Sequence, residues 1–290
     1  MDKTKKKKDF FGVLPKGTIF AGIMLNYKPI VKSSYSINCR GRLIDLSTPQ
    51  VMGILNVTPD SFFAGSRKQT EAEIAERANQ IVEQGGTMID VGAMSTRPGY
   101  DDVTKEEEMR RLRLALPIIR REQPDAIISV DTFREEVARM AVEEYGADII
   151  NDVRGEMTPP RVPYIYMSSA PTSEAVLMDF AEKVQRLRDQ GHKDIILDPG
   201  FGFGKTVEQN YEVLGNMERL QVMQLPILVG VSRKSMIWKK LGITPDEALN
   251  GTTALNTIAL QKGATILRVH DVKEAVETVI LNCQFSIFNS

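Results

Sequence analysis

The sequence has few residues that could cross-link the chain or bind a metal: two cysteines and two histidines among 290 residues. Cys39 and Cys283 lie at opposite ends of the chain and form no metal-ligand spacing. We interpret them as free thiols in a reducing cytoplasm. His192 lies in an expected helix-to-strand loop, and we assign it no role. A disulfide framework and a cysteine-based metal site are therefore not indicated.

The sequence also lacks a charge imbalance and a long apolar run. Its formal net charge is −1, which gives no reason to expect nucleic acid or a membrane surface as a partner. No apolar stretch reaches the roughly 18 residues needed to span a bilayer. With 290 residues and 42% apolar residues, the chain is large enough for one barrel-sized domain with a buried core.

The first residues resemble a signal peptide only in part. Lys3 to Lys8 precede an apolar region, but Pro15, Lys16 and Gly17 interrupt it. We interpret residues 1–35 as a basic extension, either disordered or translated from upstream of the natural start. Residues 36–290 are expected to form a single domain.

Eight short apolar runs, most of them ending in polar residues, alternate with segments of helical periodicity. The runs are VMGILN (51–56), MIDVG (88–92), AIISVD (126–131), DIIND (148–152), VPYIYM (162–167), DIILD (194–198), ILVGVSRK (227–234) and ATILRVH (264–270). Helical patterns cover about 70–84, 104–121, 133–145, 173–190, 208–221, 246–262 and 272–283. Apolar runs without strict alternation are typical of parallel strands covered on both faces.

This alternation predicts an α/β fold, a TIM (β/α)8 barrel whose active site lies at the carboxyl ends of the strands. Two alternating stretches around Arg40-Gly41 predict an N-terminal β-hairpin that precedes it. Asp131-Thr132 and Thr244-Pro245-Asp246 are good contexts for the starts of the helices near 133 and 246.

One crossover is too short for the barrel pattern. Only nine residues, 153–161, separate the fourth strand from the fifth, whereas a crossover with its helix takes at least ~10–12 residues. Pro159-Pro160 also prevents a helix from running into the next strand. We expect the fourth outer helix to be missing or reduced to a turn, leaving the outside of two strands exposed.

Polar residues at four strand ends predict a pocket for a flat, nitrogen-rich heterocycle. They are Asp131, Asn151, Asp198 and Lys234, and in a barrel they converge. A carboxylate can accept two parallel N–H bonds from a guanidine-like edge. One or two of these groups could be structural pairs instead, but four strand ends together favour a binding site.

A second group of residues predicts an anion site beside this pocket. Arg268 and His270 alternate on one strand and so face the same side. Together with Asn56, Arg97 and Ser232-Arg233 they suit a diphosphate, and Asn56 with diphosphate oxygens could hold Mg²⁺. The run PGFGFGKT (199–206) is not a P-loop, because Pro199 stands where the first glycine is required.

Seven ordered motifs resemble those of bacterial dihydropteroate synthases, from about residue 36 to the carboxyl terminus. They are VMGILNVTPDSF (51–62), STRPG (95–99), ISVDT (128–132), IINDV (149–153), LDPGFGFGK (197–205), VGVSRKS (229–235) and RVHDV (268–272). The resemblance implies a transferase of folate biosynthesis and a target of sulfonamide drugs. It would join 6-hydroxymethyl-7,8-dihydropterin diphosphate to p-aminobenzoate and release diphosphate.

The resemblance also implies a role for each matching position. Asp131, Asn151, Asp198 and Lys234 would bind the pterin, Arg268 would cover its ring, and Asn56 would bind Mg²⁺. Thr96, Arg97, Pro98, Phe201 and Ser232 would frame p-aminobenzoate. The implied catalytic residues are Asp60, Arg97, Lys234, Arg268 and His270. The family further implies a cytoplasmic homodimer.

The sequence departs from the family at four places. Ala64 replaces an Asp of the first loop, and Met94 replaces a polar residue before STRPG. Ser168-Ser169-Ala170-Pro171 replaces a His and a Gly-rich turn after the fifth strand, and the 153–161 crossover is short. Two alternatives therefore stay open: a pterin-binding barrel with lost or reduced activity, and a pterin-using methyltransferase.

Overall fold

In a computed structural model, residues 35–57, 67–94, 103–155 and 157–287 are described. Contacts divide the chain into Met1–Lys32 and Ser33–Ser290, and every described residue belongs to the second unit. The basic extension predicted for residues 1–35 lies outside the described residues, except for Tyr35. No helix of the described part is long and apolar enough to cross a membrane.

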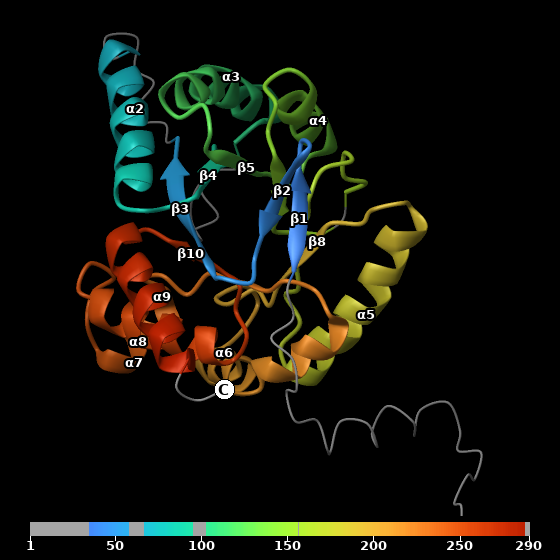
Figure 1. The fold of residues 1–290 in the computed structure, drawn as a ribbon, viewed down its shortest axis with the longest axis vertical. Helices are drawn as coiled ribbons and strands as arrows, with labels where there is room; N and C mark the ends of the chain where they lie inside the picture. Colours follow the sequence, from blue (N-terminus) through green and yellow to red (C-terminus); the bar gives the residue numbers. More distant parts are fainter. Residues whose placement is uncertain (1–34, 58–66, 95–102, 156, 288–290) are drawn as a thin grey trace, which may run out of the picture. The chain divides into compact units, whose positions relative to one another are not determined.

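Eight parallel strands form one barrel-shaped sheet, as the sequence predicts (Figure 1). The strands are β3 (Gln50–Asn56), β4 (Met88–Gly92), β5 (Ile127–Asp131), β6 (Ile149–Asp152), β7 (Tyr164–Met167), β8 (Ile195–Asp198), β9 (Leu228–Val229) and β10 (Ile266–Val269). Their order is β8-β7-β6-β5-β4-β3-β10-β9. A parallel bridge between Leu197 and Ile227 brings the two ends of the sheet together.

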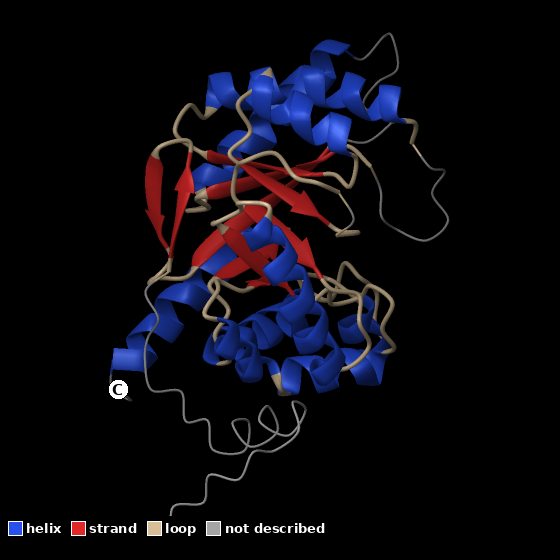
Figure 2. Cartoon of the chain, turned by 90° about the vertical axis from the view of Figure 1, so that its right-hand side faces the viewer, coloured by secondary structure: helices blue, strands red, loops and turns tan. Residues whose placement is uncertain are grey.

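Helices follow most strands and flank the sheet on both sides (Figure 2). They are α2 (Arg67–Glu83), α3 (Lys105–Glu122), α4 (Glu135–Glu143), α5 (Ser173–Asp189), α6 (Val207–Gly215), α7 (Ser235–Leu241), α8 (Leu249–Gln261) and α9 (Val272–Ile287), with a 3₁₀ helix at Met217–Met223. The hydroxyls of Thr104, Thr172 and Thr206 cap α3, α5 and α6 by accepting a backbone N–H.

Three helices begin two or three residues from their predicted starts, and one helix was not predicted. The helix expected from about 70 begins at Arg67. The helix after β5 begins at Glu135, because Thr132 Oγ1 accepts the Arg134 N–H and forms a turn instead of a cap. The helix expected from 246 begins at Leu249, since Thr244 bonds to the Glu247 carboxylate in a preceding turn. The short helix α7 was not predicted.

The predicted hairpin consists of β1 (Ser36–Cys39) and β2 (Arg42–Asp45), joined at Arg40-Gly41. It lies across one end of the barrel (Figure 1). Its buried side chains Ile37 and Cys39, with Leu46, pack on the barrel's innermost apolar layer. That layer contains one residue from each strand: Met52, Met88, Ile127, Ile149, Ile165, Ile196, Leu228 and Ile266. The hairpin thus closes the amino-terminal end of the barrel.

No helix lies among the described residues between β6 and β7, as the short crossover predicts. The expected exposure of the two strands is wrong, because every residue of β6 and β7 is buried. The side chains of Tyr164 and Tyr166 cover part of the outer strand surface that the missing helix would cover. The Tyr164 hydroxyl donates to Asp152 Oδ2 at 2.5 Å, and the Tyr166 hydroxyl donates to Asp179 Oδ1 at 2.9 Å.

The shortened crossover between β6 and β7 packs against these two tyrosines and Asp152. Asp152 Oδ1 accepts the backbone N–H groups of Arg154 and Gly155, both at 2.8 Å. Gly155 has φ +69°, and a Cβ there would lie 2.1 Å from the Tyr166 ring. Only glycine allows the chain to pass this close to the tyrosine.

Candidate active site

A layer of polar side chains lies two residues beyond the apolar layer, at the carboxyl ends of the strands. Side chains alternate along a strand, so positions two apart point to the same side. The layer contains Asp90, Ser129, Asn151, Asp198 and Arg268, together with Ile54, Met167 and Gly230. The sequence thus places five polar groups inside the barrel at the face where TIM-barrel sites are found.

Arg268 links two strands of this layer. Its Nε donates to Asp90 Oδ2 at 2.6 Å and its Nη2 donates to Asp131 Oδ2 at 2.9 Å. Asn151 Nδ2 donates to the same Asp90 oxygen at 3.1 Å. These contacts hold a guanidinium, an amide and two carboxylates in one network.

Asp90 was not among the predicted site residues. Its side chain is completely buried on β4. In the sheet, β4 lies between β10, which carries Arg268, and β6, which carries Asn151, and Asp90 bonds to both residues. The alternation of side chains from Met88 places Asp90 inside the barrel. The sequence prediction used polar residues at strand ends, whereas Asp90 lies in the middle of β4. Asp90 orients the two residues that the sequence did identify.

Three buried polar atoms of the layer have no hydrogen-bond partner among the described residues: Asp90 Oδ1, Asn151 Oδ1 and Ser129 Oγ. A buried polar atom without a partner costs about 1–3 kcal/mol. Unpaired atoms are rare in protein interiors and cluster where a ligand supplies the missing partner. The layer therefore has the donor and acceptor capacity for a polar ligand.

Asp198 and Lys234 lie on the other side of the layer. Asp198 Oδ1 accepts the Gly200 N–H at 2.8 Å, while the Lys234 ammonium donates to the Phe201 carbonyl and lies 4.5 Å from the centre of the Phe203 ring. Burial lowers the pKa of Lys234 to about 8 and raises the pKa of Asp198. Burial likewise raises the pKa of Asp131 to about 7, against the opposing effect of Arg268.

His270 and Ser232 form a pair at the rim of the site. The Ser232 hydroxyl lies 3.0 Å from His270 Nδ1, and burial lowers the pKa of His270 to about 4, with the Arg268 charge adding to the effect. The imidazole is therefore neutral at pH 7. Arg77 of α2 donates to the carbonyls of His270 and Ile54 at 2.7 and 3.2 Å, which joins the ends of β10 and β3.

The Arg233 guanidinium, predicted for the anion site, is paired with Asp271, the residue that follows His270. Its Nη2 and Nε donate to the two Asp271 oxygens at 2.7 and 2.9 Å, and its Nη1 donates to the Asp246 carbonyl. Phe201 has a fully buried side chain. Asp60, Thr96, Arg97 and Pro98, with Ala64, lie outside the described residues.

Asn56 and Asp131 end two strands on either side of Gly92, which pairs with both. A Cβ at position 92 would lie 3.4 Å from Asn56 Oδ1 and 3.9 Å from Asp131 Oδ2. The glycine thus leaves an amide and a carboxylate oxygen facing the same space. These hard oxygen donors suit Mg²⁺, which takes one or two carboxylate or amide oxygens and completes its shell with water and phosphate.

The segment after β7, where the sequence departs from the expected Met-His, packs on the loop after β8. Ser168 is buried and donates its N–H to the Asp198 carbonyl at 2.9 Å. Lys205 Nζ donates to the Ser168 and Gly200 carbonyls, each at 3.1 Å. A Cβ at Gly200, where φ is +66°, would lie 2.2 Å from the Ser168 oxygen. The altered segment therefore still forms a closed wall beside Asp198.

Comparisons with known proteins agree with this arrangement. A family model for pterin-binding enzymes matches residues 52–270. The dihydropteroate synthase of Escherichia coli (strain K12) is 39% identical over 265 residues, covering 83% of this chain and 93% of that protein.

Two solved structures give the same result. That of Xanthomonas albilineans dihydropteroate synthase with 4-aminobenzoic acid has a TM-score of 0.79 and 36% identity, covering 87% of this chain and 98% of its own. That of the Yersinia pestis enzyme with a sulfonamide drug has a TM-score of 0.76 and 35% identity, covering 87% and 99%. The chain belongs to the dihydropteroate synthase family of pterin-binding enzymes.

Proposed function

We propose that this chain is an active dihydropteroate synthase of the cytoplasm. It would join the diphosphate of 6-hydroxymethyl-7,8-dihydropterin to p-aminobenzoate and release diphosphate. The observation that carries the proposal is the polar layer inside the barrel, in which Arg268 is held between Asp90 and Asp131 beside unpaired buried oxygens.

The pterin would bind against this layer. Its amino-pyrimidinone edge presents adjacent N–H donors that a carboxylate accepts in a fork, which suits Asp198. Asn151 and Asp131 would bind the remaining ring nitrogens, and the Lys234 ammonium would donate to the ring carbonyl. By the family resemblance, Arg268 would lie over the ring, with its Nε donating to Asp90.

The diphosphate would lie at the rim, near Arg268, His270, Ser232 and Asn56. In the neutral tautomer with its proton on Nε2, His270 would accept from the Ser232 hydroxyl at Nδ1, 3.0 Å away, and would donate from Nε2 to a phosphate oxygen. Asn56 would hold Mg²⁺, which would neutralise charge on the leaving diphosphate. The Arg268 guanidinium would stabilise the same developing charge.

The C–O bond to diphosphate would break first and leave an electron-poor methylene conjugated with the pterin ring. The amine of p-aminobenzoate would then attack this carbon and lose a proton to solvent. Positioning and electrostatics would supply most of the rate, so that no covalent nucleophile is needed. Thr96, Arg97, Pro98, Phe201 and Ser232 would frame p-aminobenzoate, with Asp60 in the first loop. A sulfonamide would compete for this part of the site; the Yersinia pestis enzyme has been solved with such a drug.

The direct test is formation of dihydropteroate from the two substrates by purified protein, with and without Mg²⁺. Magnesium-dependent product would support the proposal. A folded protein that binds the pterin diphosphate but forms no product would favour the alternative, a pterin-binding barrel without turnover. Methyl transfer from a reduced folate would instead favour a methyltransferase.

A further inference from the structure

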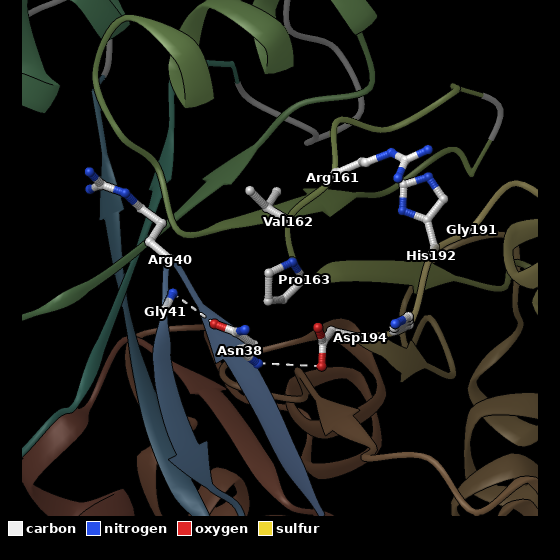
Figure 3. A pocket seen from close by; sticks show the side chains of 10 residues that line it. Asn38, Arg40, Gly41, Arg161, Val162, Pro163, Gly191, His192 and Asp194 are labelled. Atoms are coloured by element: carbon white, nitrogen blue, oxygen red, sulfur yellow. Dashed lines mark hydrogen bonds between the residues drawn. The ribbon is translucent and has the colours of Figure 1, made fainter.

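A cavity of ≈ 380 Å³ opens on the amino-terminal face of the barrel, opposite the active site. Its walls come from three places: the hairpin turn at 38–41, residues 161–163 before β7, and residues 191–194 before β8 (Figure 3). Residues 161–163 reach this position directly from β6, because the crossover has no helix among its described residues. The cavity is thus bordered by the segment in which this chain departs from its relatives.

The charges around the cavity are mostly positive. Arg40, Arg161 and Lys193 line it together with one carboxylate, Asp194. Asp194 Oδ1 accepts the Asn38 N–H at 3.3 Å, and Arg40 Nη1 donates to the Gly146 carbonyl at 2.9 Å. Among the described residues, neither Arg161 nor Lys193 forms an ion pair.

A buried histidine also faces this space. His192 is only 7% exposed, its ring lies 6.5 Å from that of Tyr164, and among the described residues only its backbone N–H forms a hydrogen bond, to the Leu187 carbonyl. The ring lies beside the Arg161 guanidinium (Figure 3). Burial, and then the Arg161 charge, lower the pKa of His192, so the ring is neutral and offers one N–H donor.

We propose that this cavity binds the phosphate group of a small organic phosphate. Arg161 supplies a planar pair of donors that matches phosphate oxygens, Lys193 supplies a point charge, and His192 supplies a neutral N–H. The cavity volume is larger than an inorganic phosphate ion needs and lies within the usual range for small-molecule sites. Val162 and Pro163 form an apolar wall for the organic part. The site is separate from the proposed pterin site at the other ends of the strands.

The test is calorimetric titration of the purified full chain with phenyl phosphate, inorganic phosphate and phenol. Phenyl phosphate should bind with one site in the wild type and equally in Arg268→Ala, which removes the guanidinium of the proposed diphosphate site but no residue that lines the cavity. Inorganic phosphate should bind more weakly at the same place, and phenol should not bind there. The double variant Arg161→Gln/Lys193→Gln should weaken phenyl phosphate binding by about tenfold or more.

The matched control is Arg113→Gln/Lys240→Gln, which removes the same charge at two exposed positions that do not line the cavity. It should bind phenyl phosphate as the wild type does, and dihydropteroate formation should be unchanged in both double variants. Equal binding by the two double variants would overturn the proposal, as would loss of binding in Arg268→Ala. A short oligonucleotide that binds at Arg161 and Lys193 ten times more tightly than phenyl phosphate would also overturn the proposal, in favour of a nucleic-acid site.

Discussion

Arg268 is the residue at which the charges of the active site meet, because its guanidinium bonds to both Asp90 and Asp131. Its proximity to these carboxylates raises its pKa despite the opposing effect of burial. A permanent positive charge at this point explains how two carboxylates can lie inside the barrel. The same charge is available to a diphosphate at the rim.

The substitution Arg268→Ala should weaken binding of the diphosphorylated pterin by about 1.5–3 kcal/mol, the usual contribution of a hydrogen bond to a charged group. A pterin without diphosphate should lose much less. Isothermal titration with both ligands measures the difference. Arg139→Ala is the control, because it removes an exposed guanidinium of α4 that bonds to Glu135. Equal losses for the two ligands would contradict the anion role of Arg268.

Lys234 gives the site a pH dependence in the alkaline range. Burial lowers its pKa to about 8, so the ammonium is charged below that pH and neutral above it. We expect kcat/KM for the pterin diphosphate to fall as the pH rises through about 8, because kcat/KM reports the free enzyme. Lys234→Arg keeps the charge at high pH and should move this decline upward. An unchanged decline in Lys234→Arg would assign it to another group.

At the scale of elements, the short crossover is compensated by polar contacts on the outside of β6 and β7. The Tyr164 hydroxyl donates to Asp152, whose other oxygen binds the crossover backbone. Tyr166 packs on Gly155 and, edge to face, on Phe180 of α5 at a centroid distance of 5.9 Å. These contacts bury surface that a helix would otherwise cover.

Tyr164→Phe should lower the free energy of unfolding by about 1–3 kcal/mol, since it leaves a buried carboxylate oxygen without this donor. Urea denaturation followed by circular dichroism measures the change. Tyr145→Phe is the matched control, because Tyr145 is half-buried and no hydrogen bond of its hydroxyl is described. If the two variants were equally stable, the Tyr164–Asp152 bond would not support the crossover.

At the scale of the whole molecule, the last two helices, which pack against each other, carry exposed apolar side chains. Ile258 of α8 is 39% exposed, and Ile280 and Leu281 of α9 are 61% and 70% exposed. A contiguous exposed apolar patch marks a contact with another protein. We therefore predict that these helices carry the interface of the homodimer that the family resemblance implies.

We expect light scattering to give the mass of a dimer for the wild type. Ile280→Asp/Leu281→Asp should shift the protein to the mass of a monomer, because charges at the centre of an apolar interface are not solvated. Leu43→Asp, at a position 73% exposed on the hairpin, is the control and should leave the dimer intact. A wild-type monomer, or a dimer in the α9 variant, would contradict this prediction.

The sequence by itself determined the eight strands, the hairpin, the missing fourth helix and most of the residues that meet in the polar layer. These features depend on local pattern: an apolar run of four to seven residues that ends in a polar one specifies a buried strand and the rim position of its last side chain. The family motifs added the roles expected for Asn151, Asp198, Lys234 and Arg268.

Only the tertiary structure decided which partners those residues have. Asp90 became a site residue because Arg268, 178 positions away in sequence, bonds to it. The outside of β7 is covered because Tyr166 contacts Gly155 and Phe180. The Arg233 guanidinium is held by Asp271, 38 positions away in sequence. The cavity at Arg161 and His192 forms where three separate segments meet. Contacts between distant segments leave no local pattern, so such features follow from packing alone.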